Sequence, residues 1–464
     1  MRSLRPSAGL VAAGTAIAVA IASAPQAAAQ DFTPGAAGVG DPYFPQSGNG
    51  GYDVGHYQLD LDYAPRRSRL TASVRIAATA TQDLSSFDLD FRGPKITSLS
   101  VDGAPAASAR QGQELIVTPA SPIAAGRDFE VAVSYAGRVG SLRDPDGSIE
   151  GWIPTGDGAF VVGEPHGAPT WFPCNDHPTD KATFEFRIAV PSRRKALANG
   201  VLTDEIKAAD KTTFVWREDE PMATYLATAT IGRFKLEQST INGIPSYVAA
   251  DPREANPSRK ALSKLPQIQS YLESLFGPYP FSSTGAIVDH ASFVGYALET
   301  QTRPLFDGAP DDVLLVHELA HQWYGDSVTP SRWADIWLNE GFATWAEWSW
   351  TAHRGGASLE RTFEKFYEVP AKRRGFWRPR PGDPGPEHLF DSTVYVRGAM
   401  TLEALREKVG DQAFLEILRR WAAEHQYGNV STPEFIALAE QQSGQDLDEF
   451  FRIWLYQTAK PKGW

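Results

Sequence analysis

The sequence contains a single cysteine, Cys174, among its 464 residues. One thiol cannot form a disulfide within the chain, so stability must come from the hydrophobic core and from any metal that the protein binds. Catalysis by a cysteine nucleophile is also unsupported, because no arrangement of Cys and His accompanies this residue. We therefore expect Cys174 to be a small buried residue.

Positive charge is also scarce in this chain. It has 44 Lys and Arg residues against 56 Asp and Glu residues, which gives a formal net charge of −12. No basic cluster is present that could bind a row of phosphates, so we predict that the protein binds no nucleic acid. The negative charge by itself indicates no more than solubility.

Long apolar runs are missing, apart from a short one near the start. Residues 9–24 are mostly apolar, follow Arg2 and Arg5, and precede the three alanines at 27–29. This pattern predicts a cleaved secretory signal peptide over residues 1–29, and therefore a secreted protein without a membrane anchor. The run is too short and too rich in alanine for a membrane span.

The remaining length is enough for two or more domains. Residues 30–52 are rich in Gly and Pro and predict a flexible leading segment. Residues 53–245 contain short alternating runs between Gly, Pro and Asp turns, which predict an antiparallel β saddle or sandwich. Over residues 246–464 the hydrophobic period changes to about 3.6, which predicts a mainly helical domain with a small sheet. The expected fold class is α+β, with two folded domains.

The strongest motif lies in VLLVHELAHQWYG, residues 313–325. Its apolar residues recur at helical spacing, so we place it on a buried helix. Residues four apart share one face of a helix, so the imidazoles of His317 and His321 can reach a single metal ion. Glu318 is rotated by about 100° from His317, which suits a base that acts on a water beside the metal.

A catalytic zinc ion needs a third protein ligand. Glu340, in WLNEGFA on the next predicted helix, is the candidate. Either histidine alone would be explained more simply as a hydrogen-bonded core residue. The full pattern instead predicts one Zn²⁺ per chain, held by His317, His321 and Glu340.

This spacing resembles that of a known family. HELAH, eighteen further residues and then Glu340 in WLNEGF are similar to the zinc signature of the gluzincin aminopeptidases, the group of aminopeptidase N and leukotriene hydrolase. Similar segments extend from about residue 52 to the end of the chain. The resemblance implies a thermolysin-like catalytic domain that hydrolyses N-terminal residues from peptides or polypeptides with a free N-terminus. It also implies that Glu318 is the general base toward a zinc-activated water.

The segment GYALET, residues 295–300, occupies the place of the family's Gly-Ala-Met-Glu-Asn motif. Tyr296 replaces the usual Gly, and Thr300 replaces the usual Asn. The resemblance implies that this strand binds the substrate backbone beside Tyr296 and Ala297, while Glu299 binds the free α-ammonium group. By pattern alone, Glu299 could also be a surface carboxylate on a strand.

Three more site residues follow from the resemblance. Glu164 stands ten positions before Cys174, where the family has a second residue that binds the substrate's ammonium. Tyr395 lies in a Tyr-x-Arg-Gly segment, with Arg397 where the family has Lys, and would hydrogen-bond the oxyanion of the tetrahedral intermediate. Glu347 would orient one of the zinc ligands. By pattern alone, Glu164 is a turn carboxylate and Tyr395 an aromatic residue at a helix start.

Two other functions remain open at this point. A zinc endopeptidase would use the same chemistry without Glu299 or Glu164. A catalytically silent peptide-binding protein would keep only the fold, although the presence of both Glu318 and Tyr395 argues against it. Larger relatives carry a further helical domain that these 464 residues do not include, which predicts an open cleft that admits long polypeptides. The patterns predict no oligomeric state.

Overall fold

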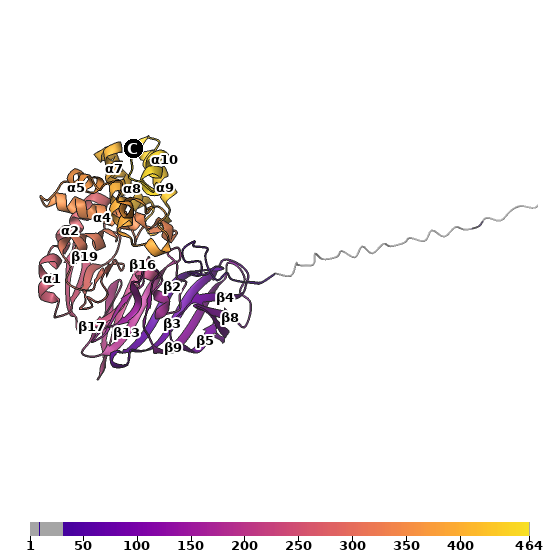
Figure 1. Cartoon of the computed structure of the whole chain (residues 1–464). Coiled ribbons are helices and arrows are strands. Elements are labelled where there is room, and N and C mark those ends of the chain that lie inside the picture. The colour runs from indigo at the N-terminus through magenta and orange to yellow at the C-terminus, as the bar shows by residue number, and fades with distance from the viewer. Residues whose placement is uncertain (1–8, 10–30, 464) are drawn as a thin grey trace, which may run out of the picture. The chain divides into compact units, whose positions relative to one another are not determined.

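The structure is a computed structural model that describes residue 9 and residues 31–463. Apart from residue 9, the predicted signal peptide over residues 1–29 lies outside the described residues. From Phe32 onward the chain forms one compact unit. Strands dominate the first half of this unit and helices the second (Figure 1), in agreement with the expected α+β fold. Among the described residues, no helix combines the length and apolar character needed to cross a membrane.

The first half is built on an eight-stranded sheet with the strand order β15-β16-β13-β2-β3-β9-β5-β6. Successive side chains of β2 point alternately into the core and away from it. Tyr57, Leu59 and Leu61 are buried, whereas the residues between them are not. Pairing is antiparallel as predicted, except that β2 and β13 are parallel. The strands are β2 (Tyr52–Ala64), β3 (Arg69–Ala80), β5 (Lys95–Val101), β6 (Ala104–Pro105), β9 (Asp128–Arg138), β13 (Lys181–Pro191), β15 (Val201–Lys207) and β16 (Lys211–Ala223).

Two smaller sheets complete this half, with the orders β1-β4-β8-β7 and β10-β11-β12-β17-β14. The turn between β10 and β11 contributes two residues to the cavity described below. The strands of the four-stranded sheet are β1 (Thr33–Pro34), β4 (Leu84–Asp90), β7 (Ala107–Gln111) and β8 (Glu114–Thr118). Those of the five-stranded sheet are β10 (Ser141–Arg143), β11 (Ile149–Pro154), β12 (Ala159–Val162), β14 (Lys195–Ala198) and β17 (Ala229–Gly232).

Another five-stranded sheet, with the order β18-β19-β20-β22-β21, opens the helical half. Its strands are β18 (Lys235–Ile241), β19 (Ile244–Ala250), β20 (Thr284–Val288), β21 (Ala297–Leu298) and β22 (Leu305–Phe306). The sheet includes residues on both sides of the proposed domain boundary at residue 245, because β18 pairs with β19 and β19 pairs with β20. A division before β18 would keep this sheet whole. A separate pair joins β23 (Thr329–Pro330) to β24 (Asn429–Val430).

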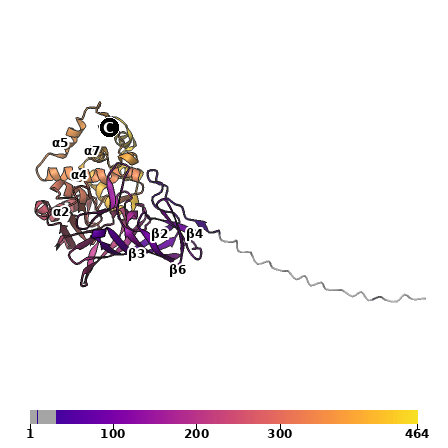
Figure 2. The same ribbon diagram turned by 60° about the horizontal axis from the view of Figure 1, so that its bottom comes forward.

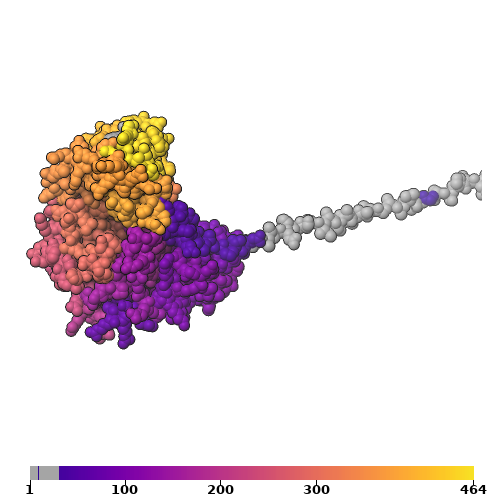
Figure 3. Space-filling model, in the orientation of Figure 1, coloured from indigo at the N-terminus to yellow at the C-terminus, as the bar shows by residue number. Residues whose placement is uncertain are grey.

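The helices group together in the second half, where Figure 2 shows α4, α5 and α7 on the side away from β2 and β3. The space-filling view of Figure 3 shows this half packed directly against the strand-rich half. The helices are α1 (Ala255–Leu262), α2 (Leu265–Phe276), α3 (Asp312–Ala320), α4 (Trp337–His353), α5 (Leu359–Tyr367), α6 (Arg374–Trp377), α7 (Ser392–Val409), α8 (Asp411–Glu424), α9 (Thr432–Ser443) and α10 (Asp448–Phe451). The sequence period predicts one kinked helix through Pro266, but the chain forms α1 and α2, with Pro266 in the first turn of α2. Proline is tolerated there because the first N–H groups of a helix have no acceptor within it.

Helices α4 and α7 approach each other closely at a pair of glycines. A Cβ atom on Gly341 would lie 2.9 Å from the carbonyl carbon of Gly398, and a Cβ atom on Gly398 would lie 2.9 Å from the Cα of Gly341. This contact bears on the candidate site, because α4 carries Glu340 and α7 carries Tyr395. The two glycines therefore allow these side chains to reach the same cavity.

Gly398→Ala is expected to lower the free energy of unfolding by about 1–3 kcal/mol, because the new methyl group would collide with the backbone of α4. Urea unfolding of the purified protein measures this change. Gly375→Ala on α6 is the matched control, since no heavy atom lies within 4 Å of its added Cβ. Both replacements also change helix propensity in alanine's favour. An equal loss of stability in the two variants would contradict the packing argument.

Candidate active site

Helix α3 begins at a strong cap. The carboxylate of Asp311 accepts hydrogen bonds from the backbone N–H groups of Val313 and Leu314, at 3.0 and 2.9 Å. The helix then ends at Ala320, earlier than the sequence period predicts, and His321 follows as the C-cap. The chain turns there, and Gly325 adopts a φ of 136°, which favours glycine.

The prediction of a buried helix is correct for the motif but wrong for its first turn. His317, Glu318 and His321 are buried, whereas Val313 and Leu314 are 36% and 38% exposed. The helical period correctly identified one face of α3. It could not show that the first turn of this helix lies at the edge of a cavity, which Leu314 lines.

The three predicted metal ligands converge. Nε2 of His317 lies 3.1 Å from Oε2 of Glu340, and Nε2 of His321 lies 3.4 Å from the same oxygen. Glu340 stands in the first turn of α4, and all three side chains are buried. One donor atom from each residue fits within 4.8 Å of the others, so the group could hold a metal ion.

The outer nitrogen of each imidazole also has an acceptor. Nδ1 of His317 lies 2.6 Å from Oε1 of Glu347, and Nδ1 of His321 lies 3.0 Å from the carbonyl oxygen of Tyr324. These acceptors favour the tautomer that carries its proton on Nδ1 and directs the Nε2 lone pair at Glu340. Two lone pairs and a carboxylate facing one another suit a zinc ion, which takes nitrogen and oxygen donors of this kind.

The carboxylates of this cluster differ in their acidity. Burial raises the pKa of Glu318 to about 8, although both histidines oppose the shift. Burial also acts to raise the pKa of Glu340, but His321 and His317 outweigh it and lower this pKa to about 2. Glu340 is therefore ionised near neutral pH and available as a ligand.

Tyr395 lies over the ring of His317, with the ring centroids 5.8 Å apart and an angle of 17° between the planes. Its position near the start of α7 is the predicted one. Burial raises the pKa of the phenol well above its usual value, and the carboxylates of Glu340 and Glu164 add to this effect. The hydroxyl therefore keeps its proton and can donate a hydrogen bond inside the cavity.

The cavity has a volume of about 650 Å³ and also holds the two predicted ammonium-binding carboxylates. Glu299 is 3% exposed and Glu164 is 8% exposed, and Oε1 of each has no hydrogen-bond partner among the described residues. Burial raises the pKa of Glu164 well above its usual value, with the charge of Glu299 the next cause. Burial also raises the pKa of Glu299. Two buried carboxylates in one cavity, each with an oxygen that lacks a hydrogen-bond partner, favour a cation beside them.

The GYALET segment forms only a short strand, because β21 consists of Ala297 and Leu298 paired with β22. Tyr296 and Ala297 line the cavity as predicted. The hydroxyl of Tyr296 donates to the carbonyl oxygen of Ile149 at 2.8 Å. Thr300 is not among the residues that line the cavity, and its hydroxyl donates to the carbonyl oxygen of Arg303 at 2.6 Å.

Six cavity residues were missed by the sequence patterns: Asp146, Ser148, Val294, Asp307, Leu314 and Phe390. The segment around Asp146 and Ser148 reads as a turn, and Phe390 follows a loop rich in Pro and Gly. Turn and loop patterns do not show which cavity they will meet, so no local signal identified these residues. Asp146 and Ser148 join the predicted Glu164 as the part of the lining that the first half of the chain contributes.

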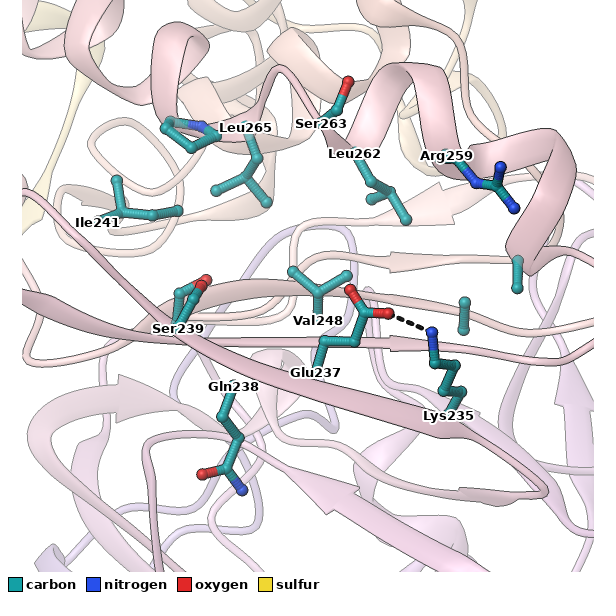
Figure 4. Close-up of a pocket in the computed structure, with 14 residues that line it drawn as sticks. Lys235, Glu237, Gln238, Ser239, Ile241, Val248, Arg259, Leu262, Ser263 and Leu265 are labelled. Atoms are coloured by element: carbon teal, nitrogen blue, oxygen red, sulfur yellow. Dashed lines mark hydrogen bonds and ion pairs between the residues drawn. The ribbon is translucent and has the colours of Figure 1, made fainter.

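A second cavity, of about 380 Å³, lies between α1 and the β18–β19 hairpin (Figure 4). Ile241, Val248 and Leu262 give it apolar walls, and an ion pair between Lys235 and Glu237 stands at its edge. It shares no lining residue with the first cavity. The predicted metal donors and the predicted ammonium-binding carboxylates therefore belong to the first cavity.

Two family models match this chain. The Peptidase M1 N-terminal domain matches residues 54–226, and the Peptidase family M1 domain matches residues 312–454. The chain is also similar to curated relatives, including Aminopeptidase M1-B of Oryza sativa subsp. japonica (29% identity over 322 residues) and Aminopeptidase M1 of Arabidopsis thaliana (29% over 331 residues). The matches cover 62% and 64% of this chain but only 36% of each relative.

Similar solved structures cover nearly the same length as this chain. The M1 zinc metallopeptidase from Deinococcus radiodurans superposes with a TM-score of 0.85 at 29% identity, over 92% of this chain and 99% of that one. A mutant M1 zinc metallopeptidase from the same organism, bound to a Tyr-Ser-Ala substrate, gives a TM-score of 0.83 at 29% identity, over 92% of this chain and 100% of that one. These neighbours share both halves of the fold.

Proposed function

We propose that this chain, which belongs to peptidase family M1, is a secreted aminopeptidase. The solved structures that resemble it are zinc metallopeptidases. The substrates are peptides or polypeptides with a free N-terminus. The observation that carries the proposal is the pair of buried, unpaired carboxylates, Glu299 and Glu164, in the same cavity as the zinc donors. Secretion is proposed from the charge and apolar pattern of residues 1–29.

The residues fit a zinc ion held by His317, His321 and Glu340. Bound there, zinc would supply Lewis-acid chemistry to the scissile carbonyl and its attacking water. Glu318 follows His317 on α3 and lines the same cavity. We assign it to accept the proton of the attacking water and to pass it to the leaving amine. The charge of a bound zinc ion would lower the raised pKa of Glu318 and so keep its carboxylate ionised for this role.

Four other residues complete the machinery. The Tyr395 hydroxyl lines the cavity beside His317 and would donate a hydrogen bond to the oxygen that becomes negative during attack. Glu347 accepts from Nδ1 of His317 and so fixes the direction of that ring. Glu299 and Glu164 would hold the α-ammonium group, which places the first peptide bond of the substrate beside the metal donors.

A panel of aminoacyl arylamides, with and without a chelator, tests the activity. Turnover that is lost on chelation and restored by zinc would support the proposal. The same reaction with N-acetylated peptides separates it from the endopeptidase alternative, which has no use for a free ammonium group. A zinc-loaded protein that turns over neither kind of substrate would support the binding-protein alternative instead.

Glu299→Gln is expected to lower kcat/KM for free-amine peptides by about tenfold to a hundredfold, because a charge-assisted hydrogen bond contributes about 1.5–3 kcal/mol. The N-acetylated form of the same peptide should be a poor substrate for both the natural protein and the variant. Glu449→Gln is a suitable control, since this glutamate is 67% exposed and lies on α10, outside the residues that line the cavity. Equal rates on the free and acetylated peptides would assign the protein to the endopeptidases.

A further inference from the structure

The cavity of the candidate site carries an excess of negative charge that the proposed function does not use. Seven carboxylates line it, and no Lys or Arg does. Five of them have roles above, in metal binding, proton transfer or ammonium binding. Asp146 and Asp307 remain, and Asp307 accepts the backbone N–H of Gly295 at 2.9 Å, which explains it as a support for the loop before β21.

Asp146 is held in a defined position on the turn between β10 and β11. Its Oδ1 accepts hydrogen bonds from the backbone N–H and the hydroxyl of Ser148, at 2.8 and 2.7 Å. Both bonds use Oδ1, so Oδ2 is available to a ligand. Ser148 lines the cavity as well, so the turn places this carboxylate at the wall.

Two contacts tie this turn to the ammonium-binding residues. His166, two residues after Glu164, lies between the carboxylates of Glu150 and Asp144, which flank the turn. On the other side, the Tyr296 hydroxyl donates to the Ile149 carbonyl at the start of β11. The turn is therefore fixed to both segments that supply the ammonium-binding carboxylates.

Tyr296 lines the cavity together with these carboxylates and Asp146, and its hydroxyl bonds the turn that carries Asp146. Burial raises the pKa of its phenol well above the usual value, and among the further causes are the charges of Glu164 and Asp146. Glu164, Tyr296 and Asp146 line the same cavity, and Tyr296 replaces the Gly of the family motif.

The direction of a bound substrate follows from this arrangement. Its α-ammonium group lies at Glu299 and Glu164, and its scissile carbonyl must turn toward the metal donors, because Glu299 has a carboxylate oxygen within 4.8 Å of a ring nitrogen of His321. The side chain of the first residue leaves the same Cα atom in another direction. The wall formed by Tyr296 and Asp146 is available to receive it.

We propose that this wall selects substrates whose N-terminal residue is arginine or lysine. The Asp146 carboxylate pairs with the cationic end of the side chain, and the Tyr296 ring packs along its length. This inference rests on the proposed aminopeptidase function, since the ammonium anchor determines where the side chain lies. It assigns Asp146 and Tyr296 as specificity-determining residues of the reaction.

The test measures kcat/KM of the purified protein for the p-nitroanilides of arginine, lysine, leucine and citrulline, which share one leaving group. Citrulline has nearly the shape of arginine but no charge. We expect arginine to exceed citrulline by about tenfold, a factor set by one partly exposed charge pair. Asp146→Asn should bring this ratio close to one and leave the leucine substrate within about twofold. The preference should also weaken as salt is added.

Two further variants complete the experiment. Asp204→Asn, at an exposed aspartate on β15, should leave all four substrates unchanged. Tyr296→Gly, which restores the family residue, should lower the rates for arginine and citrulline together, because both lose the ring. An arginine-to-citrulline ratio that survives Asp146→Asn would overturn this inference alone. If the natural protein cleaved none of the arylamides but cut N-acetylated peptides, both this inference and the proposed function would fall.

Discussion

Glu318→Gln is expected to bind one zinc ion per chain and to lose turnover by roughly a hundredfold to ten-thousandfold, the range that a positioned general base contributes. Glutamine has nearly the shape of glutamate but cannot accept a proton at neutral pH. Glu318 lies outside the donor group of His317, His321 and Glu340, so that group should survive the change. The rate should therefore fall while the metal content stays constant.

Metal analysis after dialysis, together with arylamide kinetics, measures both quantities in the same preparation. A second group of residues could also hold the metal, because donor atoms of Glu299, Glu318 and His321 likewise lie within 4.8 Å of one another. If that group held the metal, the variant would lose zinc together with its activity. Glu364→Gln, at an exposed glutamate on α5, is the matched control and should change neither quantity.

The metal donors could be predicted from the sequence because their geometry is local. His317 and His321 are four residues apart at the end of one helix, and that spacing alone places them on the same face. The third donor, Glu340, lies on the next helix, so its position required only that α4 pack against α3. The β half could be predicted for a similar reason, since burial alternates along its long strands β2, β3 and β13.

The placement of Tyr296 and Asp146 in one cavity could not be predicted, because it depends on contacts between distant segments. Tyr296 reaches the carbonyl of Ile149, which is 147 residues earlier in the chain. The hydrophobic period of a helix or strand shows which of its residues share a face. It does not show which other part of the protein, or which cavity, that face will contact. Leu314 shows this limit, since it follows the apolar period of α3 and yet lines the cavity with 38% of its surface exposed. The parallel pairing of β2 with β13 is likewise decided by tertiary structure.

His321→Ala is expected to abolish zinc binding and with it at least about a thousandfold of the turnover, because two remaining donors hold zinc poorly. The residue is 1% exposed, and the hydrogen bond from its Nδ1 to the Tyr324 carbonyl fixes the direction of its ring. Metal analysis of the purified variant should find no stoichiometric zinc. This result would distinguish a ligand from a residue that only supports the fold.

Thermal unfolding separates these two roles most clearly. A ligand that binds only the folded state stabilises it by about 4 kcal/mol at a thousand times its Kd, so a chelator should lower the Tm of the natural protein. The Tm of His321→Ala should not respond to chelator or to added zinc. His388→Ala, at an exposed histidine before α7, should keep both the zinc and the response. If His321→Ala kept a zinc-dependent Tm close to that of the natural protein, His321 could not be a ligand, and the metal would have to be held by other residues of the cavity.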